Sequence, residues 1–140
     1  MRFADAMSQK PDKKCVLLAD DDPIVVEMMK LHLEQEGYNV LTATNGEDVL
    51  SCLRTNGPVD VLLLDVQMPK LDGYQVCRQL KENVETKGIP ILLFYGAESD
   101  RLPDKCIEAG ANDWIERPFR SRELLEKVTR LLGLRSQEEG

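Results

Sequence analysis

Five short hydrophobic runs recur along the chain, and each is followed by a segment whose apolar residues repeat with the period of an α-helix. Strands linked by helices on short connections form right-handed crossovers in a parallel sheet. The sequence therefore predicts an α/β fold, a five-stranded parallel sheet in a (βα)5 three-layer sandwich. We expect strands near 15–20, 38–43, 60–65, 89–95 and 113–116, and helices over 23–36, 46–56, 73–84, 103–109 and 122–132.

Capping residues support these helix boundaries. Asp22 stands directly before Pro23, and an aspartate followed by a proline is a favourable start for a helix. Gly37 supplies the left-handed residue that commonly ends one. Three later helices have the same kind of capping residue, at Asn45, Asp72 and Ser121.

Length and composition limit the domain organisation and the partners. A chain of 140 residues with 42% hydrophobic content supports one domain, which we place at 15–133, between a flexible N-terminal extension (1–14) and a polar tail (134–140). The formal net charge of −7 argues against direct binding of nucleic acid or of an anionic membrane. Four cysteines without a C-x-x-C pair indicate reduced thiols, and no apolar run reaches transmembrane length, so we expect a cytoplasmic protein.

Two of the predicted strands end in aspartate. The first leads into Asp20, Asp21 and Asp22, and the third leads into Asp65. If these strands are parallel neighbours, their carboxyl ends meet at the edge of the sheet where open α/β folds bind ligands. Clustered carboxylates repel one another unless they hold protons or a hard cation with a preference for oxygen ligands. Asp20, Asp21 and Asp65 therefore predict a Mg²⁺ site that acts on phosphate.

The segment that follows Asp65 carries the most specific motif. It reads Val66-Gln67-Met68-Pro69-Lys70-Leu71-Asp72-Gly73, and a later segment ends in Arg117-Pro118-Phe119. With the acidic pair after the first strand, these motifs resemble the receiver domain of two-component response regulators, over roughly residues 15–133. The resemblance implies a flavodoxin-like fold and a role in a phosphorelay.

The resemblance also implies roles for individual residues. Asp65 would be the phosphoacceptor, Asp21, Asp65 and the main-chain carbonyl of Gln67 would bind Mg²⁺, and Asp20 would assist through a water molecule. Arg117 stands where the family has a lysine and would bring its charge to the site after a cis peptide with Pro118. The phosphoryl donor would be a sensor histidine kinase or a phosphotransfer protein, and an output domain or partner protein would receive the signal.

The switch region departs from the family pattern. The family has a small hydroxyl residue after the fourth strand, whereas this chain has Tyr95 or, in a slipped register, Gly96. Trp114 replaces a tyrosine or phenylalanine, and Pro103 predicts a short fourth helix that begins late. These changes fall on the surface of the fourth helix, fifth strand and fifth helix, through which receivers can form homodimers. Two functions stay open: a phosphorylation-driven switch, and a degenerate receiver that is a phosphorylation-independent protein-interaction module.

Two enzyme-like alternatives fit less well. Phosphatases with an aspartate nucleophile have a second acid two residues later, and Gln67 occupies that position. A nucleotide or flavin binder favours a loop rich in Gly, Ser or Thr after the first strand, where this chain places three aspartates that repel phosphate. We therefore expect no substrate turnover.

Overall fold

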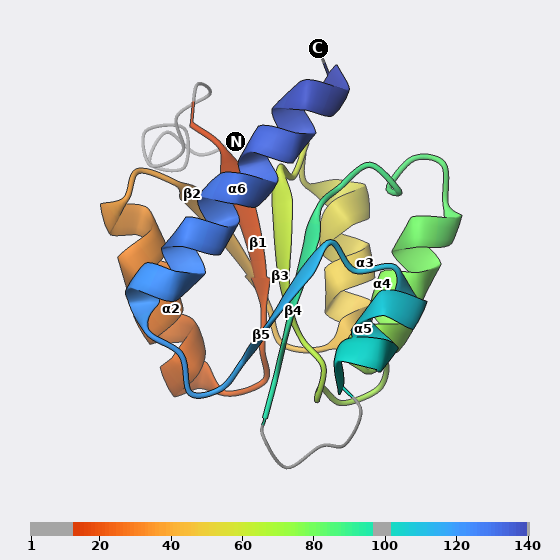
Figure 1. Cartoon of the computed structure of the whole chain (residues 1–140), viewed down its shortest axis with the longest axis horizontal. Coiled ribbons are helices and arrows are strands. Elements are labelled where there is room, and N and C mark those ends of the chain that lie inside the picture. The colour runs from red at the N-terminus through yellow and green to blue at the C-terminus, as the bar shows by residue number, and fades with distance from the viewer. Residues whose placement is uncertain (1–12, 97–101, 140) are drawn as a thin grey trace.

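The computed structural model describes residues 13–96 and 102–139 and shows the predicted alternation of strands and helices (Figure 1). The strands are β1 (Cys15–Ala19), β2 (Asn39–Ala43), β3 (Val61–Asp65), β4 (Ile91–Tyr95) and β5 (Asp113–Glu116). The helices are α2 (Pro23–Gln35), α3 (Gly46–Thr55), α4 (Gly73–Glu82), α5 (Leu102–Ala109) and α6 (Ser121–Glu139). Most boundaries agree with the predicted ones to within two residues.

The strands form one parallel sheet in the order β2-β1-β3-β4-β5. Strand β1 lies between β2 and β3, with Val16 paired to Val61 and Ala19 paired to Leu64. The last residue of β3, Asp65, pairs with Phe94 of β4. The prediction that the two strands ending in aspartate are parallel neighbours is therefore confirmed.

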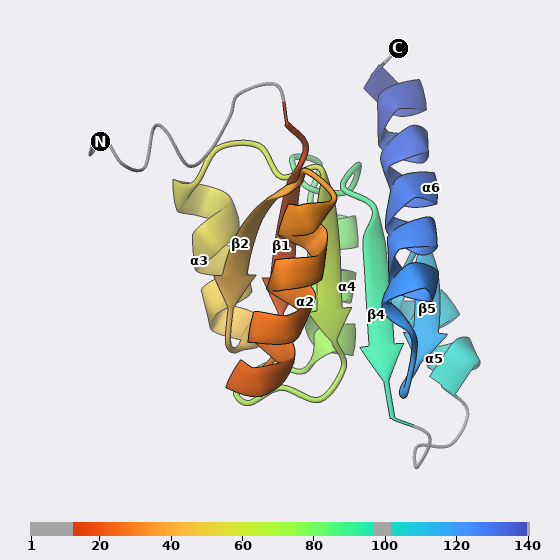
Figure 2. The ribbon, with the colours of Figure 1, turned by 90° about the vertical axis from the view of Figure 1, so that its left-hand side faces the viewer.

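Helices cover both faces of the sheet (Figures 1 and 2). Helices α2 and α6 pack on one face, and α3, α4 and α5 pack on the other. Alternate strand residues point to opposite faces, so consecutive leucines of β1 and β3 enter different core clusters. Because both faces are covered, the central strands are apolar along nearly their whole length. Burial of this hydrophobic surface stabilises the sheet.

Side-chain caps hold the helix starts close to the carboxyl edge of the sheet. Asp22 accepts a hydrogen bond from the backbone N–H of Ile24 at 3.0 Å, and Asn45 accepts one from Asp48 at 2.9 Å. Asp72 and Gln75 form a reciprocal capping box at the start of α4. Ser121 is the first residue of α6, so its predicted position just before the helix is wrong by one residue.

Helix α6 is longer than predicted. We expected it to end near residue 132, with a polar tail over 134–140, but the helix continues through Gly133 to Glu139. A single helical glycine costs only about 1 kcal/mol relative to alanine, and the residues that follow it include Leu134, Arg135 and Gln137, which are good helix formers. Residues 1–12 of the predicted N-terminal extension, and Gly140, lie outside the described residues.

Helix α5 begins at Leu102, with Pro103 in its first turn, as the proline predicted. Residues 97–101, which precede this helix, lie outside the described part of the chain. Over the ranges 13–96 and 102–139, no helix combines the length and the apolar character that a membrane crossing requires.

Candidate functional site

Three carboxylates meet at the carboxyl edge of the sheet. Asp20 follows β1, Asp21 is its neighbour, and Asp65 ends β3. Each contributes an oxygen atom to a group in which all three atoms lie within 4.8 Å of one another. Asp20 and Asp65 are buried, with 0% and 2% of their surface exposed, whereas Asp21 is exposed. The structure thus brings together the three acids that the sequence singled out.

Backbone N–H groups fix the two buried carboxylates. Asp20 Oδ1 accepts a hydrogen bond from the N–H of Asp22 at 2.9 Å, and Asp65 Oδ1 accepts one from the N–H of Gln67 at 3.0 Å. Gln67 lies in the connection between β3 and α4, with its side chain exposed. The same connection is closed by a 3.0 Å bond from the N–H of Gly73 to the carbonyl of Val66. The loop geometry therefore sets the orientation of Asp65.

Arg117 reaches the buried carboxylates from the segment after β5. The bond between Arg117 and Pro118 is a cis peptide, as the resemblance implied. Arg117 Nη2 lies 3.1 Å from Asp65 Oδ2 and also contacts Asp20 Oδ2. Its guanidinium carbon lies 5.0 Å from the centre of the Phe94 ring, which is a cation–π distance. The resemblance implied that Arg117 brings its charge to the site but did not indicate the contact with Asp20, because β3 and β4 separate β5 from β1 in the sheet.

Burial controls the acidity of the two inner carboxylates. Burial raises the pKa of Asp65 to about 6, although the N–H of Gln67 and the charge of Arg117 both favour the ionised form. Burial also raises the pKa of Asp20, against the opposing effects of the Asp22 N–H and of Arg117. The protein therefore holds two desolvated carboxylates side by side, a state that costs stability and that a cation relieves.

The raised pKa predicts that Asp65→Asn stabilises the fold at neutral pH. The pKa of Asp65 in the folded protein is about 6, above the ordinary 3.8, so the fold loses stability as the pH rises from 3.8 to 6, and the full cost is present above pH 6. We expect Asp65→Asn to increase the free energy of unfolding by about 1–3 kcal/mol at pH 7.5, measured by urea denaturation. The gain should shrink as the pH falls from 6 towards 4, where the native carboxyl takes up its proton.

Asp22→Asn is the matched control for this measurement. Asp22 is exposed, and asparagine is an equally good helix cap, so its stability should change by less than about 0.5 kcal/mol. If Asp65→Asn lowered the free energy of unfolding at pH 7.5, or raised it equally at every pH, burial of the ionised Asp65 carboxylate would not be the cause of the stability change.

Two of the switch-region residues, Tyr95 and Trp114, lie on the same side of the sheet. Tyr95 ends β4 and is 6% exposed in the core cluster that faces α3, α4 and α5, and Trp114 packs half-buried against the same cluster. Phe94, the residue before Tyr95, points to the other face, which carries the Arg117 contact. Tyr95 therefore fills core space on the opposite side from Arg117. Gly96, the candidate in the slipped register, directly follows β4, and residue 97 lies outside the described residues.

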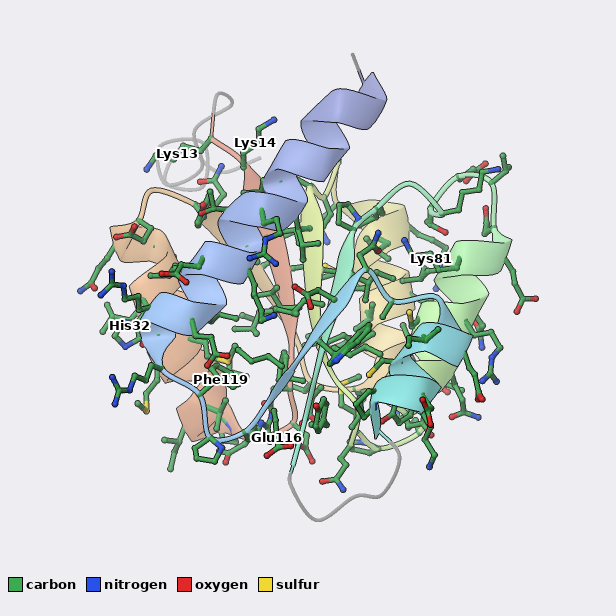
Figure 3. All side chains as sticks on the ribbon, in the orientation of Figure 1. Lys13, Lys14, His32, Lys81, Glu116 and Phe119 are labelled. Atoms are coloured by element: carbon green, nitrogen blue, oxygen red, sulfur yellow. The ribbon has the colours of Figure 1, made fainter. Side chains whose placement is uncertain are left out.

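A cavity of about 630 Å³ opens beside the carboxylates, between α2 and the β5–α6 connection. His32 of α2 and Phe119 of the connection, both labelled in Figure 3, contribute to its walls. Gln67, Gly96 and Arg117 line its end nearest to the site. Sequence analysis did not find this cavity, because its walls come from segments that only the fold brings together.

A family model identifies the chain. The model of the response regulator receiver domain matches residues 16–129. The chain belongs to this family. Receiver domains are in general phosphoacceptor switches rather than enzymes, and they typically bind Mg²⁺ in an acidic pocket of the kind that Asp20, Asp21 and Asp65 form here.

Curated relatives of this receiver domain are response regulators. It is 36% identical over 119 residues to the alkaline phosphatase synthesis transcriptional regulatory protein PhoP of Bacillus subtilis, covering 85% of this chain and 48% of PhoP. It is 38% identical over 125 residues to response regulator MprA of Mycobacterium sp. strain KMS, covering 89% of this chain and 53% of MprA. The receiver domain thus spans about half the length of these relatives.

Solved structures agree with this assignment. The signal receiver domain of a signal transduction histidine kinase from Syntrophus aciditrophicus superposes with a TM-score of 0.80 at 33% identity, covering 86% of this chain and 90% of that one. A CheY-like response regulator receiver domain protein from Methanospirillum hungatei JF-1 gives a TM-score of 0.82 at 27% identity, with 91% and 99% covered. The flavodoxin-like receiver fold predicted from the sequence is confirmed.

Proposed function

We propose that this receiver domain accepts a phosphoryl group on Asp65 from a sensor histidine kinase or a phosphotransfer protein, with Mg²⁺ as cofactor. The observation that carries the proposal is the meeting of three carboxylates within 4.8 Å, with Asp65 buried at the end of β3 and in contact with Arg117. A buried carboxylate beside a cationic side chain suits a nucleophile that must approach an anionic group.

The donor set fits a hard divalent cation. Asp20, Asp21 and Asp65 offer only oxygen ligands, and Mg²⁺ prefers carboxylate oxygens together with water. We assign Asp21 and Asp65 as direct ligands, with the main-chain carbonyl of Gln67 as a third and Asp20 acting through water. When bound, the cation neutralises charge on the phosphoryl oxygens and helps to align the transfer.

The residues of the chain perform the remaining steps. An ionised Asp65 oxygen forms a bond to phosphorus while the bond from phosphorus to the donor nitrogen breaks, and the leaving nitrogen keeps that electron pair and gains a proton from water. Asp65 Oδ1 stays fixed by the Gln67 N–H, so Oδ2 is the oxygen available for attack. Arg117 then places its guanidinium next to the transferred group, where it can donate to a phosphoryl oxygen.

Incubation with a small phosphodonor and Mg²⁺ tests the proposal. We expect intact-mass measurement to show the gain of one phosphoryl group with Mg²⁺ and a gain at least about tenfold smaller in excess chelator, because the buried acids need the cation. No gain in either condition would contradict the proposal. A gain that leaves the affinity for the partner protein unchanged would favour the phosphorylation-independent interaction module, which the buried Tyr95 at the switch position supports.

One surface of the domain would contact the output domain or partner protein that responds to phosphorylation. We assign the output, and a homodimer contact, to the face of α5, β5 and α6, where Lys127 lies 3.2 Å from Asp113 and ties α6 to β5. We assign Tyr95 and Trp114, which belong to the core cluster that faces α3, α4 and α5, to the switch region, together with Gly96, which directly follows β4. We further propose that the protein is cytoplasmic and that an output domain or a partner protein receives the signal. We propose no direct contact with nucleic acid.

A further inference from the structure

The connection between β3 and α4 contains a residue in an unfavourable backbone conformation. Lys70 has a φ angle of 71°, in the left-handed region, where the Cβ atom of an ordinary residue approaches the following carbonyl oxygen. Such a conformation persists only where the surrounding structure enforces it. The same connection contains Gln67, whose main-chain carbonyl the proposed function assigns to the cation. The shape of the connection therefore bears directly on the Mg²⁺ site.

The start of α3 enforces this shape. Helices α3 and α4 lie side by side on one face of the sheet (Figures 1 and 2), and Gly46, the first residue of α3, is buried. A Cβ atom at Gly46 would lie 2.5 Å from the carbonyl oxygen of Leu71 and 2.6 Å from the Leu71 Cβ atom. Cγ2 of Val76, in α4, would lie 2.9 Å away. The backbone of α3 therefore packs directly against the residue that follows Lys70, and only glycine leaves room for this approach.

An ion pair joins the same two segments but constrains them less. Lys70 Nζ lies 3.5 Å from Oε2 of Glu47, in the first turn of α3. The two side chains are 57% and 63% exposed, and ion pairs in solvent contribute little to stability. Atoms in close contact cannot interpenetrate, and a backbone carbonyl cannot rotate aside as a long side chain does. The packing at Gly46 is therefore the main constraint on the connection.

The connection has little freedom to absorb a shift at Leu71. Pro69 fixes its own φ angle, and the Met68 side chain is buried in the core. At the other end of the connection, the backbone N–H of Val66 donates a hydrogen bond to a carbonyl of β4 at 3.0 Å. Gln67 lies between these constrained positions, so a displacement that begins at Leu71 reaches its peptide group.

We propose that Gly46 is a positioning residue for the Mg²⁺ site: it admits the close approach of Leu71, and the start of α3 thereby holds the connection in the shape in which the Gln67 carbonyl serves as a ligand. The inference rests on the proposed function and extends it to a helix that supplies none of the assigned ligands. Mg²⁺ affinity then depends on the contact between Gly46 and Leu71. By thermodynamic linkage, bound Mg²⁺ stabilises that contact by the same factor.

Calorimetric titration of the folded wild type, Gly46→Ala and Gly57→Ala with Mg²⁺ tests this role. Gly46→Ala should bind Mg²⁺ about tenfold or more weakly, as is typical when a residue that orients a metal ligand is changed. Gly57 follows α3, is exposed, and has nothing within 4 Å of an added Cβ atom, so Gly57→Ala should stay within about twofold of the wild type. A purely structural role for Gly46 would lower the free energy of unfolding but leave the Mg²⁺ affinity of the folded protein unchanged.

Amide hydrogen exchange in the wild type gives a second readout that needs no variant. The N–H groups of Asp48 and Val49 bond within the first turn of α3, and that of Asn56 bonds at its other end. Saturating Mg²⁺ should slow exchange at Asp48 and Val49 by a factor similar to the change in affinity, and leave Asn56 unchanged. If Gly46→Ala does not fold, this measurement decides.

Three results would overturn the positioning role while leaving the Mg²⁺ site intact. They are equal affinities in all three folded proteins, an equal loss of affinity in both variants, and exchange in the first turn of α3 that does not change at saturating Mg²⁺. If none of the proteins took up Mg²⁺, the wild type included, the proposed function would be overturned as well.

Discussion

Asp65→Asn is expected to abolish phosphoryl uptake. The asparagine keeps the shape of the side chain and an acceptor for the Gln67 N–H, but its amide nitrogen is not a nucleophile. With a small phosphodonor and Mg²⁺, the rate of mass gain should fall by about a thousandfold or more. Because the same change removes a buried negative charge, the variant should stay folded, so the loss reports chemistry and not unfolding.

Asp22→Asn is the control for this loss. Asp22 lies next to the acidic pair in sequence, but its side chain caps α2 and is exposed. Its phosphoryl uptake should remain within about threefold of the wild type, since the charge it removes lies in solvent. Uptake by Asp65→Asn at the wild-type rate would place the acceptor on another residue.

Gly73→Ala is expected to have the largest effect on stability. A Cβ atom at Gly73 would lie 2.7 Å from Val66 Cα and 2.9 Å from the carbonyl carbon of Asp65. Both contacts are with backbone atoms, which cannot rotate aside as a side chain does. We expect a loss of about 2–4 kcal/mol in the free energy of unfolding, measured by urea denaturation, and slower phosphoryl uptake because the end of β3 must shift.

Gly133→Ala is the matched control for that substitution. Gly133 lies within α6, and a Cβ atom there would meet nothing within 4 Å. Alanine should therefore stabilise the helix by up to about 1 kcal/mol. If Gly73→Ala were as stable as the wild type, the tight packing of α4 against the Asp65 strand would not hold in solution.

The sequence predicts the fold well because local and tertiary signals agree. The apolar run before Asp65 is buried on both sides, so its composition alone indicates a central parallel strand. The caps at Asp22, Asn45 and Asp72 fix the helix starts, and the structure confirms each of them. The end of α6 lies beyond the predicted residue 132, because a glycine such as Gly133 ends a helix only where the backbone turns left-handed, as it does at Gly37.

The site could be predicted only in part. Asp20, Asp21 and Asp65 follow adjacent strands, so their convergence follows from the topology. The contact of Arg117 with Asp20 depends on how a long side chain crosses the ends of two strands, and residue spacing does not encode that path. The inward packing of Tyr95 follows from its place in β4, one residue after Phe94, but which neighbours it meets required the positions of α4 and α5.

Location of the phosphoryl group by peptide mapping tests the central claim most directly. The wild-type protein would be treated with a phosphodonor and Mg²⁺, the acyl phosphate trapped by reduction, and the modified residue located by mass spectrometry. The account predicts modification at Asp65. Modification at Asp20, at Asp21 or at a residue outside this cluster, or the absence of any acyl phosphate, would contradict it.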